Sequence, residues 1–154
     1  MPLGNSALIV EFGRKISVDL NERSIALAQH LDAHPFPGYI ESVPAYASTA
    51  VFYDPLEVLR SNISSDGTAF ETVAAHVESI LSKTSGALKI EDRRIAIPVS
   101  FSKEDALDLT AISDRSGLGP NDVIEIFTTI RYRVFMLGFL PGFAYMGEVD
   151  AKIA

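Results

Sequence analysis

The residues best suited to hold a ligand lie in one short segment, residues 138–145, where glycine, proline and aromatic side chains alternate. Glycine lets a backbone come close to a bound molecule, and glycine amides could face an anionic group. The aromatic rings could wall an apolar cleft, with a phenol hydroxyl as its polar tip. The candidate substrate-binding residues are Gly138, Phe139, Pro141, Gly142, Phe143 and Tyr145. The same residue types equally fit a tight turn inside a β-barrel whose core the rings fill, so residue types alone leave both interpretations open.

His30 and His34 are the residues that most resemble metal ligands, because side chains four positions apart share one face of a helix. However, Pro35 pushes His34 out of helical geometry, and the sequence suggests no third ligand. We therefore expect a solvated helix end here and no metal site in this chain. His76 stands beside a series of apolar helix positions and is expected at the surface or at the core boundary.

No catalytic residue can be assigned from the sequence. The chain contains no HExxH, no P-loop, no GxSxG and no Rossmann glycine pattern. The absence of cysteine excludes thiolate catalysis, disulfides and cysteine metal sites. Tyr46, Tyr53 and Asp54 lie at the expected ends of strands. Tyrosine there usually packs its ring on the core and leaves its hydroxyl in water, so a structural role is favoured.

Length and composition indicate a folded chain that does not bind nucleic acid. With 154 residues, 47% of them hydrophobic, it can bury one sizeable core, or one small core and part of another. Its formal net charge of -7 would repel a phosphate backbone. The apolar runs are far shorter than the roughly 18 to 20 residues that cross a bilayer, so we expect no membrane span. The first residues do not form a secretory signal, which makes the cytoplasm the expected location.

The first part of the chain alternates between strand and helix patterns. Asp19 and Glu22 have the spacing of a capping box at the start of a helix, and residues 35–38 end it. The expected elements are a strand at 7–12, a helix from 19 that ends before 35, an antiparallel hairpin of strands at 39–43 and 49–53, a helix over 70–81 that Gly86 ends, and a strand at 94–99 that Pro98 confines to an edge or an end. This β-α-β-β-α-β order predicts a ferredoxin-like domain over residues 1–98, and the fold class is α+β.

Residues 99–154 indicate a second domain that opens with two helices, expected at 103–115 and 120–130. Such a pair could be a DNA-binding helix-turn-helix. The helix that would enter the groove carries Asp122 and Glu125, however, so phosphate and base contacts lack their usual donors. A helical pair packed against a neighbouring barrel is therefore favoured.

A strand at 134–137 follows, and Pro141 with Gly142 fits a type II turn, in which proline presets one dihedral and glycine supplies the positive φ. An apolar strand this close to the last residue has few local partners. This argues either for further sequence or for pairing between chains, as in a homo-oligomer.

Three stretches of the sequence resemble one known family. The most specific is the string Gly138-Phe139-Leu140-Pro141-Gly142-Phe143-Ala144-Tyr145, preceded by Tyr132-Arg133-Val134. The others are Gly4-Asn5-Ser6-Ala7-Leu8-Ile9-Val10-Glu11-Phe12-Gly13, and Val43-Pro44-Ala45-Tyr46 with Tyr53-Asp54-Pro55. In this order they resemble the family of 5-oxoprolinase B subunits, which is also called allophanate hydrolase subunit 1 and includes the KipI-like kinase inhibitors. The resemblance covers the whole chain.

The resemblance implies a ferredoxin-like domain followed by a cyclophilin-like β-barrel, of which residues 99–154 would hold the helical pair and the first part. Members of the family resemble the carboxyltransferase part of urea carboxylase. They act with the companion A and C subunits of 5-oxoprolinase in opening the ring of 5-oxoproline, a small cyclic amide. The implied cofactor is ATP, at the level of the complex. Other members inhibit a sporulation histidine kinase.

This chain departs from the family pattern at three places. Phe127 stands where the family usually has histidine, Ser100 where it has cysteine, and Gly147 is followed by Glu148 in place of a second glycine. The loss of the histidine removes a proton carrier, and Glu148 adds a charge near the expected cleft.

We therefore expect a subunit of an ATP-dependent 5-oxoprolinase-type amide hydrolase that does not act alone. The rival hypothesis is a regulatory module that blocks a histidine kinase through its surface, and a third is a degenerate relative with a structural role. Neighbouring genes for companion subunits would favour the enzyme, whereas a neighbouring kinase-regulator operon would favour the inhibitor.

Overall fold

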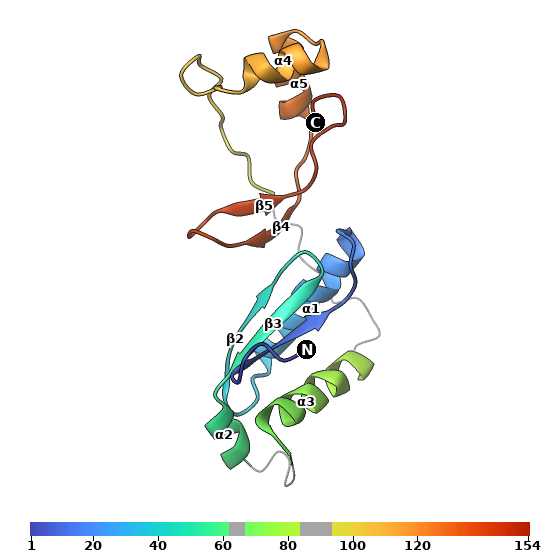
Figure 1. The fold of residues 1–154 in the computed structure, drawn as a ribbon, viewed down its shortest axis with the longest axis vertical. Coiled ribbons are helices and arrows are strands. Elements are labelled where there is room, and N and C mark those ends of the chain that lie inside the picture. Colours follow the sequence, from blue (N-terminus) through green and yellow to red (C-terminus); the bar gives the residue numbers. More distant parts are fainter. Residues whose placement is uncertain (62–66, 84–93) are drawn as a thin grey trace. The chain divides into compact units, whose positions relative to one another are not determined.

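The computed structural model of the chain describes residues 1–61, 67–83 and 94–154, and it forms two compact units, Met1–Glu91 and Asp92–Ala154. Each unit combines helices with an antiparallel sheet (Figure 1). The mixture of helices and antiparallel strands that the sequence predicts is therefore confirmed. None of the described helices is long and apolar enough to cross a membrane.

The sheet of the first unit has the strand order β1-β3-β2, and β3 is antiparallel to both neighbours. Strand β1 spans Ala7–Glu11, β2 spans Tyr39–Pro44 and β3 spans Ser48–Tyr53. The predicted hairpin of the second and third strands is confirmed. Burial alternates along β3, since Thr49, Val51 and Tyr53 are fully buried while the residues between them are half-buried.

Helix α1 (Val18–Ala33) packs on the buried face of this sheet. It begins at Ser17, whose Oγ accepts a hydrogen bond of 3.3 Å from a backbone N–H of the first turn. The capping box predicted for Asp19 and Glu22 is therefore wrong, because the extended backbone of Ser17 already places a hydroxyl over the free N–H groups. The helix ends before residues 35–38, as the sequence predicts.

Helix α3 (Ala69–Lys83) is the second helix that packs against the core. The helix predicted from its apolar spacing is confirmed, and Val73 and Val77 on its apolar face are almost fully buried. The stop expected at Gly86 lies outside the described residues. The buried core cluster consists of Leu8, Leu27, Leu31, Phe36, Val51, Tyr53, Val58, Ala69, Val73 and Val77. Because residues of both helices join one cluster with Val51, both helices cover the same face of the sheet. On the opposite face Ala7 is buried, and the other side chains are half-buried or exposed.

Buried polar side chains attach α1 to the β2–β3 hairpin. Asn21, Ser24 and Thr49 are all fully buried. The Asn21 side-chain amide donates to the Ala45 carbonyl at 3.0 Å, and the Thr49 hydroxyl donates to the Ser24 carbonyl at 2.9 Å. The Ser24 hydroxyl in turn donates to the Ser48 carbonyl. Because these buried groups are hydrogen-bonded, they fix the position of the helix along the hairpin without leaving polar atoms unsatisfied.

Helix α2 (Pro55–Arg60) was not predicted. Asp54 caps it by accepting hydrogen bonds of 2.8 and 3.2 Å from two N–H groups of the first turn. Strand β3 ends at Tyr53, before the Asp-Pro pair, as the sequence predicts, but aspartate followed by proline also begins a helix. The Asp54 N–H donates to the Gly38 carbonyl at 2.7 Å, and Gly38 has a φ of 84°. A Cβ at Gly38 would lie 2.9 Å from the Val58 side chain, so the turn requires glycine.

The strand predicted at residues 94–99 is wrong. These residues have irregular backbone, and their isoleucine and valine side chains are exposed. Pro98 lacks the N–H that a strand ladder needs. In addition, Met1 and Ile9 exchange two hydrogen bonds of 2.8 Å, so the start of the chain already occupies part of the outer edge of β1.

The second unit contains two helices and a hairpin of strands. Its elements are α4 (Leu109–Ser116), α5 (Pro120–Thr129), β4 (Val134–Leu137) and β5 (Ala144–Met146). Helix α5 and strand β4 were predicted, whereas β5 was missed. Val123, Phe135 and Ile153 are almost fully buried.

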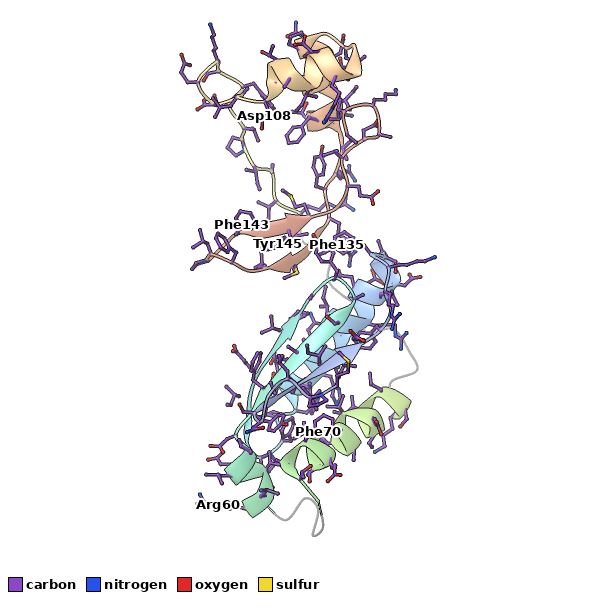
Figure 2. The ribbon with its side chains drawn as sticks, in the orientation of Figure 1. Arg60, Phe70, Asp108, Phe135, Phe143 and Tyr145 are labelled. Atoms are coloured by element: carbon purple, nitrogen blue, oxygen red, sulfur yellow. The ribbon has the colours of Figure 1, made fainter. Side chains whose placement is uncertain are left out.

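The helix predicted at 103–115 is shorter than expected. Helix α4 begins only after Asp108, which is marked in Figure 2. The residues before it form a separate turn, in which the Ser102 hydroxyl donates to the Asp105 carboxylate at 2.8 Å. Hydrogen bonds from the Ser100 and Ser102 side chains lower the pKa of Asp105. These local bonds hold the backbone in a turn and take it out of the helix.

Tyr53 provides a test of the packing of the first unit. The side chain is fully buried and its hydroxyl has no hydrogen-bond partner among the described residues, contrary to the prediction that the hydroxyl reaches water. Burial raises its pKa. We expect Tyr53→Phe to keep the free energy of unfolding or raise it by about 1 kcal/mol, because an unsatisfied buried hydroxyl destabilises the fold.

The matched control is Tyr39→Phe. The Tyr39 hydroxyl donates to Asp32 and lies 2.8 Å from the Ser42 Oγ, so its removal should lower the free energy of unfolding by about 1 kcal/mol. Urea unfolding measures both variants. An equal loss of stability in Tyr53→Phe and Tyr39→Phe would contradict the packing described for Tyr53.

Candidate functional site

The candidate residues form the turn of the β4–β5 hairpin and the start of β5. Leu137 pairs with Ala144 and Met136 pairs with Tyr145. A bulge next to Phe135 shifts the register, so Val134 pairs with Met146. The hairpin therefore brings together all six candidate residues in one continuous piece of structure.

Two tight turns follow one another at the tip of the hairpin. The Phe143 N–H donates to the Leu140 carbonyl at 3.0 Å and Gly142 has a φ of 81°, which confirms the predicted type II turn. Just before it, the Leu140 N–H donates to the Gly138 carbonyl at 2.8 Å across Phe139, whose φ is 64°. This is a γ-turn with a positive φ, a strained conformation for an aromatic residue.

The aromatic rings of the hairpin form a row. The ring centroids of Phe139 and Phe143 lie 6.1 Å apart, and those of Phe143 and Tyr145 lie 5.2 Å apart, both in edge-to-face orientation. Figure 2 marks Phe143 and Tyr145 near one another on the hairpin. Phe139 is 84% exposed and Phe143 is 49% exposed, whereas Tyr145 is half-buried. The row therefore presents an apolar surface with the Tyr145 hydroxyl at one end.

The exposure of the rings bears on the two interpretations of residues 138–145, a wall of a ligand cleft or a turn whose rings fill a barrel core. The rings of Phe139 and Phe143 are exposed, so they are not core side chains in the part of the chain that the structure describes. The Gly138 N–H donates to the Phe143 carbonyl at 3.1 Å, so it cannot also face an anion as we expected. The Gly142 N–H makes no hydrogen bond to the described residues. That the rings wall a substrate cleft stays a prediction.

The histidines lie in the first unit, away from the hairpin in sequence. The rings of His30 and His34 stack with centroids 4.8 Å apart, and the His76 ring meets Phe36 edge-on at 5.3 Å. His76 is half-buried, at the boundary of the core. Within the described ranges, no group of three or more His, Cys, Asp or Glu side chains is placed to hold a metal ion.

The sequence matches one family along its full length. The family described as carboxyltransferase domain, subdomain C and D, matches residues 1–154. The chain belongs to this family. The resemblance to 5-oxoprolinase B subunits is also confirmed, because proteins of that name match almost the whole chain.

The relatives within this carboxyltransferase family are longer than the chain. The 5-oxoprolinase B subunit of Bacillus subtilis is 37% identical over 152 residues, which cover 99% of this chain and 63% of that protein. The protein of the same name from Escherichia coli is 28% identical and is also covered over 63% of its length. The crystal structure of a protein named TTHA0988 matches 96% of this chain with a TM-score of 0.72 and 28% identity, and the match covers 26% of that protein. The chain therefore spans less than two thirds of the length of the curated relatives.

Phe127, the position where the resemblance to 5-oxoprolinase B subunits implies a histidine, has a structural role here. It packs between Phe101 and Tyr132, with ring centroids 6.1 and 5.4 Å away. The Tyr132 hydroxyl donates to the Phe127 carbonyl at 3.1 Å. Burial, and then the negative charge of Asp150, raise the pKa of Tyr132. An aromatic cluster thus occupies the place where a proton carrier was expected.

The strained turn generates a first prediction for this site. Phe139→Gly should slow hydrogen exchange of the Phe143 amide about threefold, because glycine adopts a positive φ without the penalty that phenylalanine carries. Gly142→Ala should accelerate the same exchange, since alanine is strained at the φ of 81°. Hydrogen exchange followed by NMR measures both variants. Faster exchange in Phe139→Gly would show that the ring, and not the backbone, holds the turn.

The histidines generate a second prediction, on pH. Burial lowers the pKa of His76 below 6.5, and the positive charges of His30 and Lys83 add to this. The unfolded chain therefore binds the proton more readily than the folded one, so no effect is expected above pH 6.5 and stability falls as the pH drops below it. Urea unfolding should show that the free energy of unfolding falls less between about pH 7 and pH 5 for His76→Gln than for the native chain. His34→Gln, at an exposed position, is the control, and an equal reduction there would contradict the assignment to His76.

Proposed function

We propose that this chain is part of a subunit of an ATP-dependent 5-oxoprolinase-type amide hydrolase that acts with the companion A and C subunits. The observation that carries the proposal is the row of exposed rings on the hairpin, which lies in the segment with the most specific motif. Relatives named as 5-oxoprolinase B subunits support it over 99% of the chain. An ATP-consuming complex of this kind belongs in the cytoplasm.

The proposed role of the hairpin is to bind the substrate. The ring of 5-oxoproline has an apolar CH₂ edge, which Phe139 and Phe143 can contact, and amide and carboxylate groups, to which the Tyr145 hydroxyl can donate. Pro141 and Gly142 set the turn that spaces the two phenylalanine rings. Ring opening breaks the amide C–N bond, and no pair of nucleophile and base lies on this hairpin. The reacting groups would therefore come from another part of the complex.

ATP does not fit the hairpin as its binding site. Residues 138–148 contain no lysine, arginine or histidine, and Glu148 adds a negative charge. A triphosphate needs cationic side chains or a nest of free backbone N–H groups, and the Gly138 amide is already bonded within the turn. The proposal therefore assigns ATP binding to one of the companion subunits and substrate orientation to this chain.

The architecture proposed for the whole protein is a ferredoxin-like domain over residues 1–98 and a cyclophilin-like barrel that begins within residues 99–154. The strand order β1-β3-β2 with two helices on one face is compatible with the first of these. The second unit exposes many apolar side chains, namely Ile95, Ile97, Val99, Leu107, Val134, Leu137, Phe139, Leu140, Phe143, Met146 and Val149. The relatives have additional length, and we propose that further barrel strands cover this surface and close a cleft around the row of rings.

The test is to express the whole protein that contains this chain together with the A and C subunits and to measure ATP-dependent release of glutamate from 5-oxoproline. Phe143→Ala should lower kcat/KM about tenfold, mainly through KM, because it removes an apolar contact to the substrate. Leu56→Ala is the matched control, since Leu56 is an apolar residue of α2 in the first unit with 60% exposure.

Two outcomes would count against the proposal. Equal effects of Phe143→Ala and Leu56→Ala would remove the hairpin from the substrate site. An assembled complex without turnover would reject the enzyme subunit, and inhibition of histidine kinase autophosphorylation by the same protein would then favour the regulatory role.

A further inference from the structure

The face of the first sheet that points away from α1 and α3 is the second apolar surface of the molecule. The register places Ile9 and Val43 on either side of Ala50, and all three belong to this outer face because their neighbours Leu8 and Val51 belong to the core. Val43 is 39% exposed, and Ile9 and Ala50 are half-buried. The middle of the face is therefore a row of aliphatic side chains that extends across the three strands.

Acidic side chains lie beside this row. Glu41 pairs with Phe52, one step further along the same face, and Glu11 pairs with Ser48 at the other end. Both glutamates are exposed. They are the only charged residues in β1, β2 and β3, which contain no lysine, arginine or histidine. The face thus has an apolar centre, with Phe52 at its margin, and negative charge at both ends.

The edges of this sheet are less suited to binding than its face. The free edge of β2 carries a bulge between Tyr39 and Glu41 and ends at Pro44, features that oppose the addition of another strand. Part of the other edge is occupied, because Met1 pairs with Ile9 on β1. A partner would therefore pack on the side chains of the face and would not extend the sheet.

We propose that this open sheet face docks an amphipathic helix of a partner protein, with an apolar stripe flanked by lysine or arginine. The stripe would lie on Ile9, Ala50 and Val43, and the cations would approach Glu11 and Glu41. The proposal holds whether or not the chain takes part in ring opening.

The charges favour this occupant over others. A second copy docked through the same face would bring two further glutamates against Glu11 and Glu41, and a nucleic acid would bring phosphates. Among the described helices of the second unit, α5 has no basic residue and α4 has only Arg115, so neither offers the required pattern. A basic helix from another protein is the occupant whose charge and shape both fit.

The test uses the whole chain and a labelled probe peptide, an 18-residue helix built from about equal numbers of leucine and lysine at amphipathic spacing. Fluorescence anisotropy at physiological ionic strength measures its affinity, and NMR shifts locate it. We expect shifts centred on Ile9, Val43 and Ala50. The double variant Glu11→Gln/Glu41→Gln should weaken binding about tenfold.

Matched variants separate this face from the general negative charge of the chain. Glu57→Gln/Glu78→Gln changes the net charge equally but alters exposed residues of α2 and α3, and it should leave the affinity within about twofold. Val43→Lys should weaken binding about tenfold, whereas Leu56→Lys, at a residue with 60% exposure on α2, should not. Circular dichroism melting checks that each variant is folded.

Several results would overturn the proposal. Equal weakening by both double glutamine variants would assign the binding to net charge alone. A dimer of the native chain that Val43→Lys dissociates would make the face an interface between copies. NMR shifts that avoid the three strands would show that the face is not a site for a basic helix.

Discussion

The alternation of side chains along β3 is the constraint on which the first unit depends. This strand is hydrogen-bonded on both sides, so its register sets the register of β1 and β2 as well. A slip by one residue would expose Val51 and Tyr53 and bury Ala50 and Phe52. The buried hydrogen bonds between Thr49 and Ser24 oppose such a slip, because it would leave their polar groups unsatisfied. The same alternation that builds the core therefore also creates the outer face with its aliphatic row.

Much of the fold could be predicted from sequence because its elements are periodic. The apolar spacing of α3 and the β-branched residues of β2 and β3 decided those elements correctly. The errors have local physical causes. Ser17 caps α1 ahead of Asp19, Asp54 serves both as the end of a strand and as a helix cap, and Asp105 holds a turn where a helix was expected. Such local hydrogen bonds do not appear in a pattern of apolar residues.

One turn of the segment that holds the candidate residues could be predicted from sequence, but the full conformation of the segment could not. Proline followed by glycine was enough to predict the type II turn, because each residue restricts its own dihedral in a known way. Phenylalanine carries no such signal, so the γ-turn at Phe139 and its positive φ could not be foreseen. The exposure of the rings also depends on what surrounds the hairpin, and a motif of residue types contains no information on that. Two turns therefore position the row of rings, and only the type II turn could be predicted from the sequence.

The turn at Gly38 links parts of the first unit that are separate in sequence. Its carbonyl accepts the N–H of the residue that caps α2, and its missing side chain leaves the space that Val58 fills. The connection between α1 and β2 is therefore interlocked with the start of α2, and neither can change in length alone. An inserted epitope or a labelled cysteine at this loop would displace the start of α2, even though the loop follows an exposed stretch and would look permissive in the sequence. Gly38, which has no side chain, is therefore a position of this unit where substitutions and insertions are poorly tolerated.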